Sequence, residues 1–287
     1  MHIKVPNLRT GYVEVLEQVL AKGTRTRPRG RETVELLGVT IHVEDPRDVF
    51  PGGVGRGAVP AIAWAEALQA VGGFQAPNLL QRLTPSFGQF MIGEALDDSG
   101  AYGCRIRGQL PVLESLLDAD PSTRQAIAMV WDPVRDLHES GTHRSCCAFL
   151  QFFIRGGRLE MHTVMRSNDA WWGLAYDAHT FAAIQLTMAD ALGISPGAYV
   201  HHAMSLHLYE ENLEAAGSLF DTGGDQQGHW RGGSLWTGSW ASTREDCESM
   251  LLAHALPAAT TSRLISIDPA HTLLRARAVI QKKLGPA

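Results

Sequence analysis

The sequence has few cysteines and no long hydrophobic run. Its 287 residues contain four cysteines, at irregular spacings that match no disulfide framework. Residues 146–154 form the longest uncharged apolar run, far short of the roughly 20 residues that a membrane-spanning helix needs. The N-terminal residues show no charged-then-apolar signal pattern. These absences argue against a disulfide-stabilised or membrane protein and predict a cytoplasmic globular protein.

An excess of basic charge is also absent. Lys and Arg total 25 against 30 Asp and Glu, so the formal net charge is −5. Proteins that bind a phosphate backbone usually carry a basic footprint, so we predict no nucleic-acid partner, although a few local arginines can bind a small phosphate. His138, His143, Cys146 and Cys147 lie close together but match no common zinc spacing, which favours the absence of a metal site over zinc.

Hydrophobic periodicity divides the chain into helices and strands. Apolar residues recur every three or four positions in the predicted helices, at residues 11–22, 61–71, 177–192 and 273–284. Strands are predicted at residues 126–131, 146–154, 159–165 and 199–209, with a Gly156-Gly157 turn between the middle two. Because strands and helices do not alternate regularly, we expect an α+β fold, a mixed β-sheet layer packed with helices, rather than a doubly wound sheet.

Three further segments complete the predicted organisation. Residues 33–43 alternate loosely between apolar and polar side chains and predict a hairpin that turns at Gly38. Residues 76–120 show no regular pattern, and residues 217–240, rich in Gly, Ser and Thr, predict a long loop. No internal repeat divides the chain, so we expect a single domain over residues 1–287.

Four short motifs lie in order between residues 146 and 209. They read Cys-Cys-Ala-Phe-Leu-Gln-Phe at 146–152, Arg-Ser-Asn-Asp at 166–169, Gly-Leu-Ala-Tyr-Asp at 173–177 and His-Leu-Tyr at 207–209. In this order and at these intervals, the motifs resemble those of the thymidylate synthase superfamily. The resemblance covers residues 120–215, is weaker over residues 11–119 and is absent from residue 216 onward, so the C-terminal part is divergent.

The resemblance implies a covalent mechanism in which Cys146 is the nucleophile. A thiolate that adds to C6 of a pyrimidine gives C5 the carbanion character that the ring otherwise lacks. Because a free thiol with a pKa of about 8.5 is mostly protonated, the site has to supply positive charge. The resemblance places Arg166 beside the nucleotide, where it would lower the thiol pKa and bind the phosphate. Without the flanking motifs, Cys146 would more simply be a small buried strand residue.

Other residues complete the phosphate site that the resemblance implies. Ser167 matches a second in-chain phosphate ligand, and Arg124 matches an arginine that the family donates from the partner subunit. A face of the sheet is therefore expected to form a homodimer interface. Residues 25–31 resemble the family's mobile phosphate loop, and the alignment leaves both Arg27 and Arg29 as candidate ligands. The alternative for this segment is a solvated basic loop.

The remaining matched residues surround the sugar, the base and the folate. His207 and Tyr209, two apart on a strand, face the same side and match the pair that bonds the sugar 3′-hydroxyl. Glu66 lies where the family keeps a glutamate that organises water and proton transfers, although a surface helix glutamate is the alternative. Asp169 matches the aspartate that holds the pterin ring. The other candidates are Gln151 for the substrate, and Tyr102, Trp171, Trp172 and Gly173 for the folate.

Asp177 decides the substrate that the resemblance implies. Thymidylate synthases have an asparagine at this position, whose amide complements O4 and N3–H of uracil. An aspartate can accept from the N4 amino group of cytosine, whereas a buried anion facing uracil O4 would cost on the order of 1–3 kcal/mol or more. The same exchange distinguishes cytidylate hydroxymethylases from thymidylate synthases. A capping role at the start of the 178–192 helix is compatible with base recognition.

The sequence therefore predicts a one-carbon transferase that hydroxymethylates C5 of CMP or dCMP with 5,10-methylenetetrahydrofolate and water. Glu66 would orient the water. Two departures from the synthases agree, because Cys147 replaces a histidine and residues 284–287 lack the hydrophobic tail that excludes water during hydride transfer. The alternatives are methylation of dUMP, as in a thymidylate synthase, and a non-catalytic nucleotide-binding homologue.

Overall fold

The structure is a computed structural model that describes residues 1–51, 59–84, 91–92, 95–96, 102–138, 144–221, 231–252 and 272–284. The strands are β1 (His2–Val5), β2 (Thr24–Thr26), β3 (Thr33–Val43), β4 (Met91–Ile92), β5 (Ala95–Leu96), β6 (Ile127–Met129), β7 (Cys147–Arg155), β8 (Arg158–Met165), β9 (Asn168–Asp169) and β10 (Ser195–Tyr209). The helices are α1 (Leu8–Lys22), α2 (Pro60–Gly72), α3 (Pro77–Leu83), α4 (Tyr102–Ile106), α5 (Leu110–Ala119), α6 (Pro133–His138), α7 (Gly173–Ala191), α8 (Glu210–Asp221), α9 (Trp240–Leu252) and α10 (Thr272–Leu284), with a 3-10 turn at Pro28–Gly30.

A mixed sheet forms the base of the molecule. Its strand order is β1-β3-β10-β8-β7-β6, with β2 added to β3 and β9 added to β10. β1 pairs parallel with β3, and β10 pairs parallel with β8 and β9, whereas the β3–β10, β7–β8 and β6–β7 pairs are antiparallel. The short β9 strand sets Asp169 opposite His207. Two segments far apart in the sequence therefore meet beside the predicted site.

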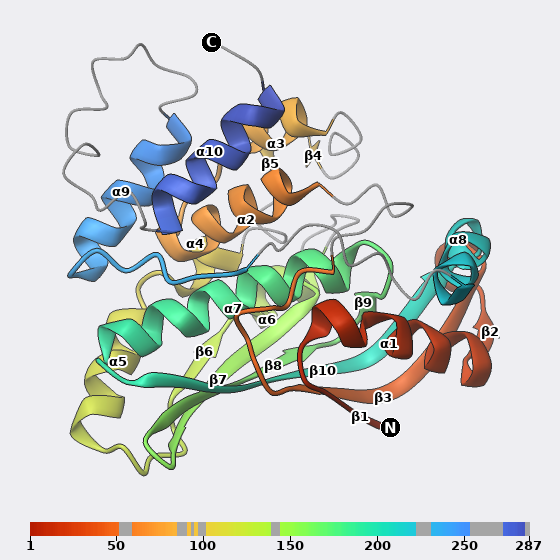
Figure 1. Cartoon of the computed structure of the whole chain (residues 1–287), viewed down its shortest axis with the longest axis horizontal. Coiled ribbons are helices and arrows are strands. Elements are labelled where there is room, and N and C mark those ends of the chain that lie inside the picture. The colour runs from red at the N-terminus through yellow and green to blue at the C-terminus, as the bar shows by residue number, and fades with distance from the viewer. Residues whose placement is uncertain are drawn as a thin grey trace.

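Helices cover one face of this sheet in successive layers. The long α7 crosses the sheet, α2 packs on the outer side of α7, and α9 and α10 pack against α2 (Figure 1). Residues 240–252 and 272–284, which lie in the divergent C-terminal part, thus join the same helical layer. The arrangement confirms the predicted α+β class with a mixed sheet packed by helices.

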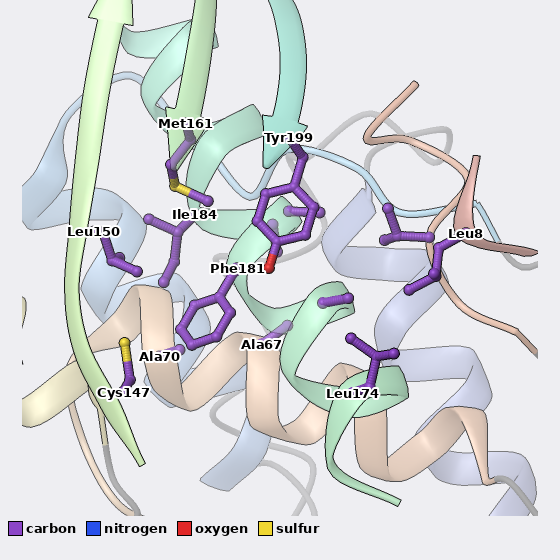
Figure 2. Packing of buried hydrophobic residues seen from close by; sticks show 14 of the residues in the cluster. Leu8, Ala67, Ala70, Cys147, Leu150, Met161, Leu174, Phe181, Ile184 and Tyr199 are labelled. Atoms are coloured by element: carbon purple, nitrogen blue, oxygen red, sulfur yellow. The ribbon is translucent and has the colours of Figure 1, made fainter. Parts of the chain in front are cut away.

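The core lies where α7 is held between the sheet and α2. Ile184 of α7 lies beside Leu150 and Met161 of the sheet, whereas the Phe181 ring lies beside Ala70 of α2 and stacks on Tyr102 (Figure 2). Ile184, Phe181, Leu150 and Met161 are all fully buried. On the other side of α7, alanines of α2, among them Ala67, allow the two helices to approach closely. Dense packing of this kind holds the middle of α7 rigidly against the sheet.

Several predicted elements are confirmed with small shifts in their bounds. The 156–157 turn joins β7 to β8 through two glycines with φ of 56° and 70°, the left-handed conformation that a two-residue hairpin turn needs. The predicted 61–71 helix is α2, which ends at Gly73 in the left-handed conformation. The predicted 177–192 helix is α7, which begins four residues earlier.

The predicted hairpin at Gly38 is wrong. β3 runs unbroken from Thr33 to Val43 and pairs with β10 over this length. Gly38 has φ of 65°, and its carbonyl accepts a hydrogen bond of 2.6 Å from the N-terminal amine of Met1. The strand bends at the glycine without turning back because a long partner strand is available, which a local pattern does not reveal.

Two other segments differ from the prediction. Residues 76–120 contain α3, α4 and α5. The first two are too short to produce a periodic signal, whereas the spacing of the buried Leu110, Leu113 and Leu117 in α5 is a helical signal that the prediction missed. Within the predicted 217–240 loop, α8 extends to Asp221 and α9 begins at Trp240. Residues 231–239 form neither helix nor strand, and residues 222–230 lie outside the described part of the chain.

A buried histidine makes the stability of the fold depend on pH. His179 of α7 packs its ring against Trp64 at 4.7 Å between ring centroids, and burial lowers its pKa to about 4. Because this value lies below the pKa of about 6.5 in the unfolded chain, the folded protein binds fewer protons between these pH values. The stabilisation is therefore complete above pH 6.5 and is lost as the pH falls toward 4.

Replacing His179 by phenylalanine should remove part of this acid sensitivity. We expect the loss of unfolding free energy between pH 7 and pH 4.5 to shrink by about 1–3 kcal/mol, because phenylalanine takes up no proton on unfolding. Urea unfolding of both proteins across this range measures the difference, and the comparison at pH 8, where the histidine is neutral in both states, isolates the packing change. An unchanged pH dependence would contradict the assignment.

Candidate active site

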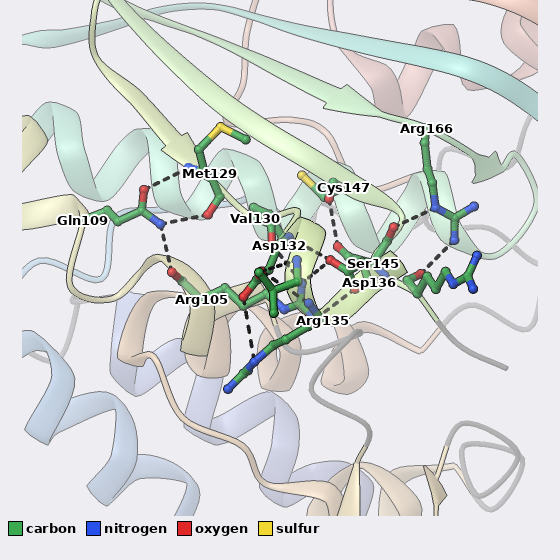
Figure 3. A network of polar contacts seen from close by, with 12 residues as sticks. Arg105, Gln109, Met129, Val130, Asp132, Arg135, Asp136, Ser145, Cys147 and Arg166 are labelled. Carbon is green, nitrogen blue, oxygen red and sulfur yellow. Dashed lines mark hydrogen bonds and ion pairs between the residues drawn. The ribbon is translucent and has the colours of Figure 1, made fainter. Parts of the chain in front are cut away.

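Cys146 lies at the end of the segment that leads into β7. The backbone N–H of Arg166, just after β8, donates to the Cys146 carbonyl over 2.8 Å, so the adjacent strand fixes both residues. The Arg166 guanidinium donates to the carbonyls of Ser145 and Arg144, each over 2.8 Å (Figure 3). Its Nη2 lies 3.7 Å from the Cys146 sulfur. The predicted pairing of thiol and guanidinium is therefore present.

The thiol of Cys146 is nevertheless not activated in this state. Burial raises its pKa above the usual value, and the nearby Asp177 carboxyl raises it further. Arg166 and Arg29 act in the opposite direction but do not outweigh the burial. The lowering effect expected of Arg166 is thus present, but it does not decide the net shift, because desolvation penalises the thiolate more than one guanidinium favours it.

A buried ion pair anchors the backbone before the nucleophile. Arg105 of α4 donates to Asp136 over 2.6 Å, and both side chains are almost completely buried. Asp136 also accepts from the backbone N–H groups of Asp132 at 2.8 Å and Ser145 at 3.3 Å (Figure 3). The Ser145 hydroxyl in turn donates to the Cys147 carbonyl over 2.8 Å. The carboxylate therefore ties the residue before Cys146 to the helical layer.

The Asp177 carboxyl lies four residues inside α7, whose N-cap is Trp172, so the capping role considered for Asp177 is wrong. Its Oδ2 accepts a hydrogen bond of 2.7 Å from the side-chain amide of Asn168 in β9. Gly173 permits this contact, because a Cβ at that position would lie 2.9 Å from Asn168 Nδ2 and 3.3 Å from Asp177 Oδ2. The structure thus gives Gly173, predicted as a folate ligand, a packing role beside the Asp177 carboxyl.

Two carboxyl groups share this buried region. Burial raises the pKa of Glu66 to about 8, with repulsion from Asp177 as the second cause. Burial likewise raises the pKa of Asp177 to about 7, against the effect of hydrogen bonds from Asn168 and Tyr102. At least one of the two carboxyls therefore holds a proton at neutral pH, which gives the site a group able to donate and accept protons. Tyr102, predicted as a folate ligand, forms a hydrogen bond with Asp177.

The C-terminal end of β10 carries the predicted sugar ligands. The rings of His207 and Tyr209 lie 5.1 Å apart, and the Arg31 guanidinium lies 3.7 Å above the Tyr209 ring. The charge of Arg29 acts on Cys146, His207 and Tyr209, whereas Arg27 forms an ion pair of 3.1 Å with Glu32. Of the two candidate phosphate ligands, the structure therefore brings only Arg29 into the electrostatic range of the thiol.

The predicted folate residues divide into exposed and buried groups. Trp172 is 41% exposed, whereas Trp171 is 2% exposed and packs in the core, with the two rings 6.2 Å apart. Asp169 accepts from the backbone N–H of Trp171 over 2.8 Å. Trp172 can thus offer a ring face to a planar ligand beside Asp169, and Trp171 cannot do so in this conformation.

Three predicted substrate ligands have no described contact with Cys146. Arg124 is exposed, and its carbonyl accepts from the Gln151 side chain over 2.9 Å. Gln151 therefore holds the segment that carries Arg124. Ser167 follows Arg166 and is half-buried.

Metal ligation receives no support from the described ranges. No group of three or more His, Cys, Asp or Glu side chains within them is arranged to hold a metal ion, although His143 lies outside these residues. In the same part of the chain, no helix combines the length and hydropathy required to cross a bilayer.

Comparison with known proteins shows the relationship of this chain. The family model described as thymidylate synthase matches residues 10–222, which include every site residue described above. The chain belongs to the thymidylate synthase family. The mixed sheet with α7 packed on one face is accordingly a thymidylate synthase-like fold, as the motifs predicted.

Two phage proteins are among the most similar relatives. The deoxyuridylate hydroxymethyltransferase of Bacillus phage SP01 is 30% identical over 223 residues, which are 71% of this chain and 57% of that protein. The deoxyuridylate hydroxymethyltransferase of Pseudomonas phage M6 is 29% identical over 228 residues, which are 76% of this chain and 64% of that protein. The matched segments thus span less than two thirds of the length of these relatives.

Sequence reasoning missed three residues of this family site. Asn168 stands inside the Arg-Ser-Asn-Asp motif, but its contact with Asp177 follows only from the turn between β9 and α7. Arg31 lay in the basic segment without being singled out, and its stacking on Tyr209 depends on the β2–β3 pairing. His201, which bonds to Asn168, lay on a predicted strand with no local signal.

A methyl group at Gly173 should damage the site selectively. We expect Gly173→Ala to lower kcat/KM by about tenfold or more, because the added Cβ displaces Asn168 or Asp177 from their hydrogen bond. Steady-state kinetics with a matched Gly217→Ala control tests this, since nothing lies within 4 Å of a Cβ at Gly217 in α8. Equal activities of the two variants would contradict the role given to Gly173.

Proposed function

We propose that this protein transfers a one-carbon unit to C5 of a cytosine nucleotide, CMP or dCMP, and releases the 5-hydroxymethyl product. The observation that carries the proposal is the Asp177 carboxyl, which stands where the resemblance implies base recognition, is half-buried within the electrostatic range of Cys146 and is held by Asn168. Membership of the thymidylate synthase family and the names of the two phage relatives support C5 hydroxymethylation as the reaction class.

Cys146 forms and later breaks the covalent bond to the base. Its sulfur adds to C6, and the electron pair moves to C5, which then bonds to the incoming carbon and loses its hydrogen as a proton. After the folate has departed, a water molecule adds to the exocyclic carbon on C5, and Cys146 leaves from C6 with its electron pair. Arg166, at 3.7 Å from the sulfur, stabilises the thiolate as it forms and as it departs.

Glu66 and Asp177 supply the proton transfers and the base recognition. Glu66, with a pKa of about 8, holds a proton at neutral pH and can exchange it with a water beside the nucleotide. Asp177 accepts from the N4 amino group of cytosine, a contact that uracil O4 cannot make with a carboxylate. The two bases are distinguished at C4, where cytosine carries a hydrogen-bond donor (N4) and uracil an acceptor (O4).

The residues at the end of β9 fit a folate. Methylenetetrahydrofolate supplies the one-carbon unit at the oxidation level of formaldehyde. Asp169 provides a carboxylate for the pterin edge, and the exposed ring of Trp172 provides an adjacent stacking surface. Because Trp171 is buried, we assign it to packing beneath this surface.

The sheet face opposite α7 is our proposed homodimer interface. It exposes Ile127, Met129 and Met204 to extents of 36%, 48% and 47%, and Met129 stands directly opposite Phe149 in the sheet. Apolar side chains exposed together on one face favour association with a partner. Gln151 positions the Arg124 segment beside the same face, which supports the prediction that Arg124 serves the partner's phosphate site.

Hydroxymethylation of dUMP is the second candidate function. The names of both phage relatives favour it. A protonated Asp177, with its pKa of about 7, could donate to uracil O4, so the acceptance of uracil would increase at lower pH.

Release of tritium from C5 tests the proposed reaction. We expect tritium to pass into water from 5-tritiated CMP or dCMP in the presence of methylenetetrahydrofolate, without formation of dihydrofolate. Dihydrofolate formed with dUMP would instead identify thymidylate synthase chemistry. Binding of nucleotide without any tritium release would identify a non-catalytic homologue and contradict the proposal.

A further inference from the structure

A chain of hydrogen bonds runs from the sheet to the base-reading carboxyl. The Tyr199 hydroxyl lies 2.7 Å from His201 Nδ1, and His201 Nε2 lies 3.0 Å from Asn168 Oδ1. Asn168 Nδ2 then lies 2.7 Å from Asp177 Oδ2. Tyr199, His201 and Asn168 are all at most 3% exposed, so water does not compete for these contacts.

The hydrogen bonds of this chain all run in one donor-to-acceptor direction. Burial lowers the pKa of His201 to about 3, so the ring is neutral and carries one N–H. Because Asn168 faces His201 with its carbonyl oxygen, that N–H must be on Nε2, and Nδ1 must accept from the Tyr199 hydroxyl. Each group therefore donates toward Asp177, and Asn168 presents N–H to the carboxyl rather than a second oxygen.

We propose that Asn168, held by His201 and Tyr199, is a specificity-determining positioning residue that keeps Asp177 a hydrogen-bond acceptor. The inference rests on the proposed function, since it concerns the carboxyl that reads the base. A donor on Oδ2 favours the carboxylate, which accepts from cytosine N4 and repels uracil O4. Without this donor, Asp177 would take up a proton more readily and could donate to O4. The buried chain of hydrogen bonds thus favours the form of Asp177 that accepts from the cytosine amino group.

Every titratable neighbour of Asp177 but one opposes its ionisation. Glu66 of α2, Asp169 of β9, Tyr199 of β10 and the thiols of Cys146 and Cys147 at the start of β7 are coupled to it as like charges when ionised. Tyr102 of α4 and Asn168 supply the hydrogen bonds that favour the carboxylate. Because the other groups disfavour the charge, the Asn168 amide has a large influence on the protonation of Asp177.

The preference for CMP over UMP should therefore depend on pH. We expect the ratio of the two affinities to rise with pH through about 7, as Asp177 ionises and rejects O4. Both nucleotides carry the same phosphate, so its own ionisation cancels in the ratio. Calorimetric titration of the full chain with CMP and with UMP between pH 6 and pH 9 measures this profile without folate or turnover.

Replacing His201 by leucine should weaken the discrimination. Asn168 loses the donor that fixes its orientation, so at pH 7.5 we expect the CMP preference to fall by about tenfold and the pH midpoint to move upward. His201→Gln, whose amide can still donate to Asn168, should restore both. If His201→Leu does not fold, Tyr199→Phe removes only the hydroxyl at the start of the chain and should shift the midpoint in the same direction.

The outcomes separate this inference from the proposed function. CMP binding with an unchanged ratio and midpoint in folded variants would overturn the role of Asn168 while leaving the function intact. A uniform loss of affinity at every pH would indicate a structural role only and would also overturn it. Failure of the wild-type protein to bind CMP, or a preference for UMP at every pH, would overturn the cytosine assignment and this inference together.

Discussion

Cys146→Ser should abolish measurable turnover, with a loss on the order of 10³-fold or more in kcat. A serine hydroxyl is a much weaker nucleophile than a thiolate, and neither Arg166 nor Arg29 can ionise it at neutral pH. The variant should still bind the nucleotide, because the proposed phosphate and base contacts come from other side chains. Tritium release from C5 and calorimetric binding of CMP separate these two effects.

A second cysteine variant controls for the loss of a thiol in general. Cys247 is a buried free cysteine in α9, in the layer beyond α2, and takes no part in the site. Cys247→Ala should retain the catalytic rate even if it lowers stability through a small cavity. Appreciable tritium release by Cys146→Ser would remove Cys146 from its role as nucleophile.

Asp177→Asn should reverse the base preference, by about 10²-fold or more in the ratio of kcat/KM for cytosine and uracil nucleotides. The Asn168 amide would bind the new carbonyl oxygen and direct the new NH₂ group toward the base. That group donates to uracil O4, whereas it meets the N4 amino group of cytosine donor to donor. The lost contact with cytosine and the gained contact with uracil therefore both shift the preference toward uracil.

Competition between CMP and UMP in one reaction measures this reversal directly. The pH profile supplies a second test, because an amide does not titrate and the variant should lose the dependence centred near pH 7. Gly217→Ala, which lies on α8 without neighbours around its Cβ, serves as an unaffected reference. An Asp177→Asn protein that still preferred cytosine would refute base reading by this carboxyl.

The sequence allowed prediction of the elements whose signal is local. The two-glycine turn at residues 156–157 and the apolar spacing of α7 both come from short-range preferences, and both are confirmed. Gly38 was predicted to form a hairpin turn, because a glycine occurs both in turns and at irregular positions inside strands. Only the pairing of β3 with β10 shows that the strand continues through it. Short helices such as α4 become stable through their packing against α2, which no local pattern contains.

The candidate site was likewise predictable where the signal is local and not where it depends on long-range contacts. Motif spacing located Cys146 and Arg166, which the structure brings to 3.7 Å. The raised pKa of the Cys146 thiol could not be predicted, because it depends on burial and on a carboxyl that lies 31 residues further along the chain. Likewise, Asn168 and His201 became visible only when β9 and β10 were paired. These features depend on contacts between segments far apart in the sequence, which motif spacing does not predict.

Product mass is the most direct test of the central claim. The full-length protein is incubated with methylenetetrahydrofolate and, separately, with CMP, dCMP, UMP and dUMP, and the nucleotides are analysed by mass spectrometry. We predict the gain of a CH₂O unit on CMP or dCMP and none on the uracil nucleotides at pH 8, where Asp177 is ionised. The gain of CH₂O or CH₂ on dUMP alone would contradict the account.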